Sequence, residues 1–140
     1  MGLIERFVTF ASGSGAEGSS PAFAQSPREH ELLRELATRA EAPDTGGAPV
    51  RYALHFTGTV QGVGFRWTNQ GLARERRLTG WVHNESDGSV AMELQGPPAA
   101  LAAHFGRLHA SYQRFGARIW LESARALTPL EDEGEFEVRF

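Results

Sequence analysis

The amino-acid sequence predicts an α+β domain over residues 50–140, in which an antiparallel-rich sheet carries two helices on one face. Short runs in which every second residue is apolar are typical of half-buried strands. Two longer segments carry apolar residues at helical spacing, and glycine or proline residues separate the runs. Residues 1–49 differ in composition and are expected to form a flexible extension.

The first predicted strand begins at Val50, because apolar and polar residues alternate from there to residue 56. A helix is predicted over residues 65–77, which contain one glycine and no proline. Its core-facing positions, three or four residues apart, are Phe65, Asn69, Leu72 and Ala73.

Two apolar runs, residues 78–83 and 89–95, are predicted to pair as a hairpin, because Asp87-Gly88 between them is a common hairpin turn. A second helix begins at Pro97-Pro98, and alternation at residues 117–121 and 136–140 predicts two further strands. The order is β-α-β-β-α-β with one extra C-terminal strand. This is the split βαβ, or ferredoxin-like, arrangement.

The extension carries one clear helix signal, near residues 27–41. Ser26 is the expected N-cap, and Glu29 is the expected acid of a capping box that reaches back to it. A helix of about fifteen residues is only marginally stable alone in water. We therefore expect a lightly docked or frayed segment, with a partner-binding helix as the alternative.

The composition excludes several classes of chemistry. The chain has no cysteine, which excludes disulfides, thiolate nucleophiles and cysteine-ligated zinc. All 14 basic residues are arginine, which excludes a Walker-type phosphate lysine and a Schiff base. Residues 51–140 hold 10 arginines and 10 acidic residues, so the domain lacks the basic surface of a nonspecific nucleic-acid binder.

Two further expectations concern location and partners. No apolar stretch approaches the ~18 residues of a membrane span, and the first residues do not resemble a secretory signal peptide. We expect a cytoplasmic monomer that binds neither nucleic acid nor a membrane.

The segment that carries the chemistry is Gly58-Thr-Val-Gln-Gly-Val-Gly-Phe-Arg66, between the first strand and the first helix. Glycines let the backbone approach a ligand closely, and the following helix N-terminus offers unpaired N–H groups and the positive end of its dipole. Arg66 can hydrogen-bond to two oxygens of one anion. These features predict a site for a tetrahedral phosphoryl group.

Other phosphate loops do not match this segment. The glycines do not fall at the dinucleotide-binding spacing, and no Gly-Lys pair is present. Val60 stands at the position, relative to Arg66, where a cysteine phosphatase has its nucleophile. A phosphate loop without a nucleophile indicates direct attack by water.

The Val-Gln-Gly-Val-x-Phe-Arg core that ends at Arg66 resembles the acylphosphatase signature. A second motif of that family, Gly-aromatic-Val-x-Asn-x3-Gly-x-Val-x5-Gly, runs from Gly80 to Gly96. Its Asn84 follows Arg66 by 18 residues, the separation that the family uses. The resemblance covers about residues 50–140.

The resemblance implies hydrolysis of the carboxyl-phosphate bond of small acyl phosphates, such as acetyl, carbamoyl or glyceroyl phosphate. It implies that Asn84 holds the attacking water, that the substrate's own phosphate is the base, and that neither a metal nor an organic cofactor is needed. It assigns the phosphoryl oxygens to the Arg66 side chain and to the main-chain amides of Gln61, Gly62, Val63, Gly64, Phe65 and Arg66.

Two alternatives remain open. One is an acylphosphatase-like module of a larger enzyme, as in hydrogenase-maturation carbamoyltransferases, although the chain lacks zinc-finger cysteines. The other is a non-catalytic module that senses an anion or binds a partner. One departure from the family pattern is Arg77, where relatives often have glycine; a left-handed conformation there would cost about 1 kcal/mol.

Overall fold

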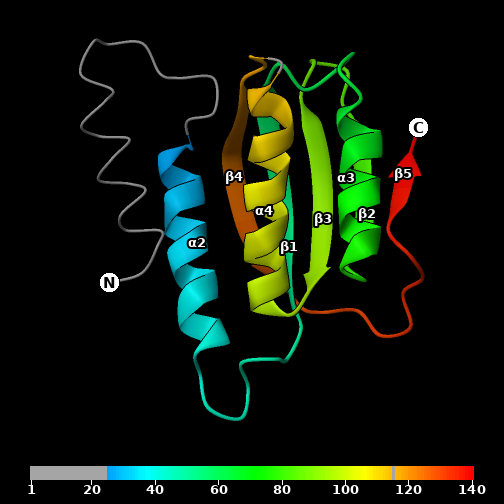
Figure 1. Cartoon of the computed structure of the whole chain (residues 1–140). Coiled ribbons are helices and arrows are strands. Elements are labelled where there is room, and N and C mark those ends of the chain that lie inside the picture. The colour runs from blue at the N-terminus through cyan, green and yellow to red at the C-terminus, as the bar shows by residue number, and fades with distance from the viewer. Residues whose placement is uncertain (1–24, 115) are drawn as a thin grey trace, which may run out of the picture.

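The computed structural model describes residues 25–114 and 116–140, which form five strands and three helices. Figure 1 shows their arrangement. The strands are β1 (Val50–Gly58), β2 (Thr79–Asn84), β3 (Val90–Gly96), β4 (Ile119–Leu127) and β5 (Glu137–Arg139). The helices are α2 (Pro27–Ala40), α3 (Phe65–Glu75) and α4 (Pro98–Gln113). None of these helices is long and apolar enough to cross a membrane.

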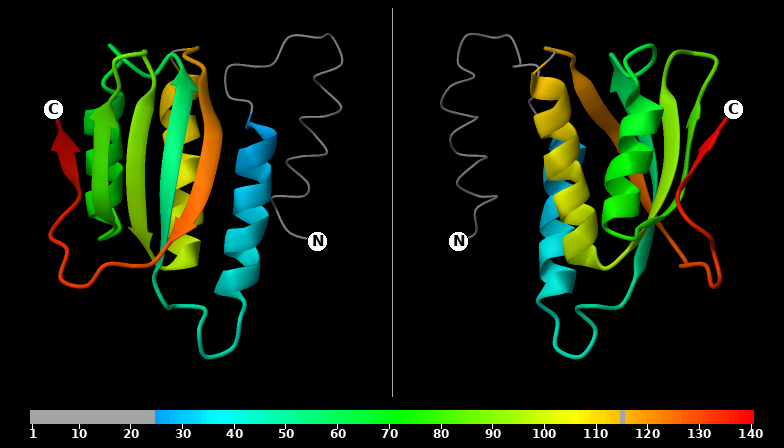
Figure 2. Two further views of the ribbon diagram at one scale, coloured as in Figure 1. Left: turned by 180° about the vertical axis from the view of Figure 1, so that it is seen from behind. Right: turned by 45° about the vertical axis from the view of Figure 1, so that its right-hand side comes forward.

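The sheet has the strand order β4-β1-β3-β2-β5. The central strand β3 pairs antiparallel with β1 and β2, β4 pairs antiparallel with β1, and β5 pairs parallel with β2. Helices α3 and α4 cover one face of this sheet (Figure 2). The predicted ferredoxin-like arrangement with an extra terminal strand is confirmed.

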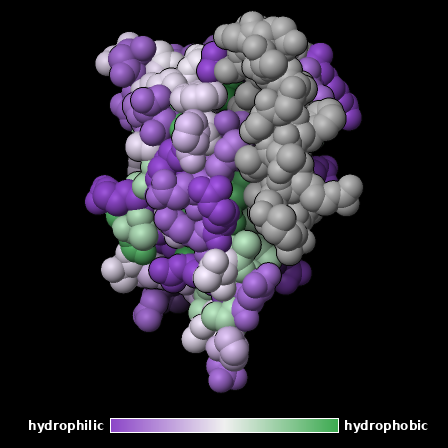
Figure 3. All heavy atoms as spheres, turned by 90° about the vertical axis from the view of Figure 1, so that its left-hand side faces the viewer, coloured by the Kyte–Doolittle hydropathy of each residue, from purple (hydrophilic) through white to green (hydrophobic). Residues whose placement is uncertain are grey.

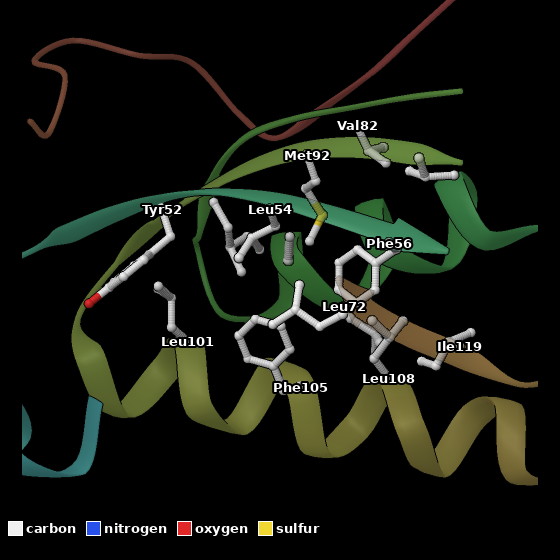
Figure 4. Packing of buried hydrophobic residues seen from close by; sticks show 14 of the residues in the cluster. Tyr52, Leu54, Phe56, Leu72, Val82, Met92, Leu101, Phe105, Leu108 and Ile119 are labelled. Carbon is white, nitrogen blue, oxygen red and sulfur yellow. The ribbon is translucent and has the colours of Figure 1, made fainter. Parts of the chain in front are cut away.

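The core lies between the sheet and these two helices (Figure 4). Alternate β1 residues, Tyr52 and Phe56 among them, are buried on the helix side. The Phe56 ring lies 5.2 Å from Phe65 at the start of α3 and 6.4 Å from Phe105 on α4. These aromatic contacts fix the start of α3 against the end of β1.

A buried polar chain supports the same turn of α3. Asn69 Nδ2 donates to the carbonyl of Phe65 (2.8 Å), which leaves Asn69 Oδ1 as an acceptor. His104 Nε2 lies 2.8 Å from that oxygen and therefore carries the proton. Burial, with a smaller contribution from the charge of Arg76, lowers the pKa of His104 to about 4, so this histidine is neutral at pH 7.

Helix α2 packs more closely than a lightly docked segment would. Leu32, Leu33 and Leu36 are buried, and the helix contacts both α4 and β4. Ser26 caps the helix as predicted: its hydroxyl accepts from the main-chain N–H of Glu29 (3.0 Å). Figure 3 shows mainly hydrophilic side chains on the side of the molecule where α2 lies.

The predicted capping box is wrong in its second half. The Glu29 carboxylate is buried and accepts from His109 Nε2 on α4 (2.8 Å), rather than reaching back to Ser26. Because α2 packs against α4, the Glu29 carboxylate pairs with a side chain of that helix instead of with the N-cap. Residues 1–24 of the predicted flexible extension lie outside the described residues.

Helix α3 ends at Glu75, and Arg77, two residues later, has the left-handed conformation considered above, with φ 56°. The main-chain N–H of Leu78 donates to the carbonyl of Ala73 (2.9 Å) and closes the helix end. A non-glycine residue therefore occupies a conformation that favours glycine.

The packing of α2 predicts that Leu32→Ala lowers the free energy of unfolding by about 2–4 kcal/mol, because it opens a cavity beneath a fully buried side chain. Urea denaturation measures this loss. The matched control is Arg34→Ala, on the exposed side of the same helix, with an expected change within about 0.5 kcal/mol. Equal effects of the two substitutions would contradict the described docking.

The neutral state of His104 predicts a loss of stability in acid. Its pKa is about 4 when folded against an ordinary 6.5, so the unfolded chain binds more protons between these values. The free energy of unfolding should fall by an amount on the order of 3 kcal/mol as the pH drops from 7 to 4. In His104→Gln the slope of unfolding free energy against pH should be shallower than in the wild type, and an unchanged slope would contradict the buried, neutral state of His104.

Candidate active site

The predicted site residues lie at one edge of the sheet. Strands β1 and β2 both run antiparallel to β3, so their C-terminal ends lie at the same edge, and β5 ends there too because it is parallel to β2. Helix α3 begins at this edge, which is uppermost in Figure 1. The fold therefore brings the loop after Gly58, Arg66 and Asn84 to one end of the molecule.

The loop backbone depends on glycine. Gly58, Gly62 and Gly64 have φ of 93°, 76° and 72°. A Cβ at Gly58 would clash with the carbonyl oxygen of Arg118, so no other residue fits there without a shift. The next amide, that of Thr59, donates to this same carbonyl (2.7 Å) and ties the start of the loop to the segment before β4.

The main-chain N–H groups that follow have no acceptor. None of those from Gln61 to Arg66 donates a hydrogen bond within the described part of the chain; pairing resumes when Thr68 donates to Gly64. Gly64 is the N-cap of α3 and supplies no side-chain cap. Unpaired amides at the positive end of a helix dipole form a binding site for an anion.

Arg66 lies in the first turn of α3 and is half-buried. Its Nη1 donates to the carbonyl of Arg139 (3.3 Å), and its guanidinium carbon lies 4.9 Å from the centre of the Phe140 ring. No carboxylate of the described residues pairs with it. A carbonyl of β5 and the ring that follows β5 therefore hold the guanidinium in place. Most of its N–H groups remain available to an anion.

Asn84 is the last residue of β2. Its Oδ1 is buried and accepts no hydrogen bond from the described residues. Its neighbour His83 alternates to the other face of the strand and approaches Glu85 (3.5 Å). An amide oxygen in this state can accept a hydrogen bond from a water molecule.

The side chain of Gln61 has a role that the sequence did not reveal. Its Nε2 donates to the carbonyls of Glu85 (2.7 Å) and Ser89 (2.9 Å), across the turn that follows Asn84. Loop and turn are thus joined by one side chain. The spacing of 24 residues between Gln61 and Glu85 gives no sequence signal for this contact.

Tyr112 of α4 also contacts this loop. Its hydroxyl donates to the carbonyl of Val63 (3.0 Å) and lies 3.2 Å from the hydroxyl of Thr68. Burial raises the pKa of Tyr112, which keeps the phenol protonated as a donor. This hydrogen bond holds the Val63 carbonyl toward α4 and so fixes the direction of the loop backbone at Val63.

Metal ligands do not gather at this site. Among residues 25–114 and 116–140, no three histidine or acidic side chains lie close enough together to hold a metal ion. The polar groups described at this end of the molecule are main-chain amides, the Arg66 guanidinium and the carboxamides of Gln61 and Asn84.

Comparison with known proteins shows the family of the chain. The acylphosphatase family model matches residues 52–138. The acylphosphatases of Oceanobacillus iheyensis and Pediococcus pentosaceus are 37% and 43% identical over 87 residues, which cover 62% of this chain and 94% of each relative. That of Salinibacter ruber is 48% identical over 63 residues, 45% of this chain and 66% of the relative.

Solved structures of similar fold include acylphosphatases as well. The crystal structure of acylphosphatase from Bacillus subtilis has a TM-score of 0.53 at 30% identity and covers 65% of this chain and 99% of that one. That of T. kodakarensis HypF has a TM-score of 0.55 at 27% identity, over 65% of this chain but 12% of HypF. These matches confirm the resemblance: the chain belongs to the acylphosphatase family of enzymes, which hydrolyse acyl phosphates.

Proposed function

We propose that this chain hydrolyses the carboxyl-phosphate bond of small acyl phosphates by direct attack of water on phosphorus. The observation that carries the proposal is the run of unpaired main-chain N–H groups from Gln61 to Arg66 at the start of α3. These amides and the Arg66 guanidinium hold the phosphoryl oxygens. In the transition state of phosphoryl transfer the charge is spread over these oxygens, and fixed donors stabilise it without reorganising.

Asn84 orients the nucleophile. Its buried, unpaired Oδ1 accepts a hydrogen bond from water and sets the direction of attack. The water oxygen forms a bond to phosphorus as the bond from phosphorus to the carboxyl oxygen breaks. The carboxylate leaves with the bonding electron pair, and a proton of the water passes to a phosphate oxygen. Because a carboxylate is a stable leaving group, no general acid is needed.

This assignment predicts that Arg66 and Asn84 both affect kcat, but that only Arg66 affects the binding of phosphate. In a phosphate-release assay with acetyl phosphate, Arg66→Gln should lower kcat about 10²- to 10³-fold, as expected for removal of a group that stabilises the transition-state charge. Asn84→Ala should lower kcat by a similar factor. Inorganic phosphate should inhibit the wild type competitively, and its Ki should rise in Arg66→Gln but stay within about threefold in Asn84→Ala, which leaves the anion site intact.

The matched control is His83→Ala, beside Asn84 but on the other face of β2, with near wild-type turnover. Full activity of Asn84→Ala would contradict its role. Tight binding of phosphate without any turnover by the wild type would instead support the non-catalytic, anion-sensing alternative.

The two hydrogen bonds from the Gln61 side chain to the turn after Asn84 predict that Gln61 positions Asn84. Gln61→Met keeps the length of the side chain but removes both donated hydrogen bonds to the turn after Asn84. We expect kcat to fall about tenfold or more, because small displacements of a reacting group are costly, while the Ki for phosphate changes little. Gln70→Ala on α3 is the control and should retain wild-type kinetics. A change in Ki with constant kcat would show that Gln61 acts on the anion and not through Asn84.

A further inference from the structure

Helix α2 lies outside residues 52–138, which the acylphosphatase family model matches, yet its first turn is fixed at two buried points. Glu29 is fully buried, and both of its carboxylate oxygens lie 2.8 Å from Nε2 of His109 on α4. Ser26 is also buried, and its hydroxyl donates to the carbonyl of Leu121 on β4 (2.6 Å). The start of α2 therefore joins α4 to β4.

The same two elements hold the two ends of the proposed phosphate loop. In the turn of α4 after His109, the Tyr112 hydroxyl donates to the carbonyl of Val63 (3.0 Å). Directly before β4, the carbonyl of Arg118 accepts from the main-chain N–H of Thr59 (2.7 Å). Figure 1 shows that α2 begins at the end of the molecule where α4 ends and β4 begins. The contacts of α2 thus lie on the helix and the strand that hold the loop.

These contacts restrict movement between α4 and β4. A buried carboxylate without a partner is costly in free energy, so the contact between Glu29 and His109 resists opening. Tyr112 lies in the last turn of α4, and Arg118 directly precedes β4. A shift of either element would move one end of the loop. Main-chain N–H groups bind one anion well only while they point at the same place, so small shifts are costly.

We propose that Glu29 and Ser26 are positioning residues for the proposed phosphate loop. By joining α4 to β4 they hold Tyr112 and Arg118, and through these the loop backbone, in the arrangement that binds a phosphoryl group. The proposal rests on the proposed function and extends the support of its site into a helix that precedes the residues matched by the family model.

The test measures binding of inorganic phosphate to the full chain by isothermal titration calorimetry, together with kcat/KM for acetyl phosphate. Glu29→Ala removes the acceptor of His109, so the Kd for phosphate should rise about three- to tenfold and kcat/KM should fall about tenfold. Glu29→Gln keeps an acceptor and should restore most of the wild-type Kd. The control is Leu36→Ala, further along α2, which should lower stability to urea and leave the Kd unchanged.

A double-mutant cycle tests the route through Tyr112. Tyr112→Phe removes the hydroxyl that holds Val63 and should itself raise the Kd for phosphate. Glu29→Ala should then add little, because that link is already broken. Ser26→Ala acts through β4, so its effect, about twofold, should add to that of Tyr112→Phe. If Glu29→Ala fails to fold, Ser26→Ala alone decides the proposal by whether the Kd rises.

Three results would overturn the proposal. A wild-type Kd in Glu29→Ala would assign Glu29 a purely structural role. Equal rises in Glu29→Ala and Leu36→Ala would show that general loosening of the fold weakens the site. Fully additive effects of Glu29→Ala and Tyr112→Phe would remove the route through α4.

Failure of the proposed function would give a different result. A wild type that binds phosphate but releases none from acetyl phosphate would refute hydrolysis, and the calorimetric comparison of the same variants would still decide the role of Glu29. A wild type that does not bind phosphate at all would overturn both.

Discussion

The pairing of β3 with both β1 and β2 is the constraint on which the site depends. Because both neighbours run antiparallel to β3, the chain leaves β1 and β2 at the same edge of the sheet. The loop that follows β1 and the asparagine that ends β2 therefore meet, although helix α3 separates them in sequence. A one-residue shift of β2 against β3 would turn Asn84 to the opposite face.

The proposed anion site is built almost without charge. Its donors are main-chain amides, and the side chains that hold its backbone are neutral: Tyr112, Gln61 and the His104–Asn69 pair. A single guanidinium, Arg66, supplies the positive charge and has no acidic partner among the described residues. Binding at the proposed site would therefore depend on main-chain amides and one cation rather than on a cluster of cations.

Local patterns predicted most of the fold because each strand and helix follows its own periodicity, from Tyr52 in β1 to the alternation around β5. The signature around Arg66 and Asn84 likewise lies in two continuous segments. What the sequence could not reveal are pairings between distant residues: Glu29 with His109, Gln61 with Ser89, and Trp67 with Phe140. Each of these pairings depends on how the helices and strands pack against one another, and no spacing within a single segment of the sequence indicates it.

Helix α2 has a consequence for self-association. The Ser26 hydroxyl donates to the carbonyl of Leu121 (2.6 Å), and the Arg28 guanidinium donates to that of Ala124 (2.9 Å), both on the outer strand β4. Carbonyls on an open outer strand can recruit the backbone of a second molecule. Here side chains of the same chain already occupy two of these carbonyls, and the opposite border of the sheet is formed by the three-residue β5. Within the described residues, α2 thus reduces the number of β4 carbonyls open to a second strand, and β5 offers a border of only three residues.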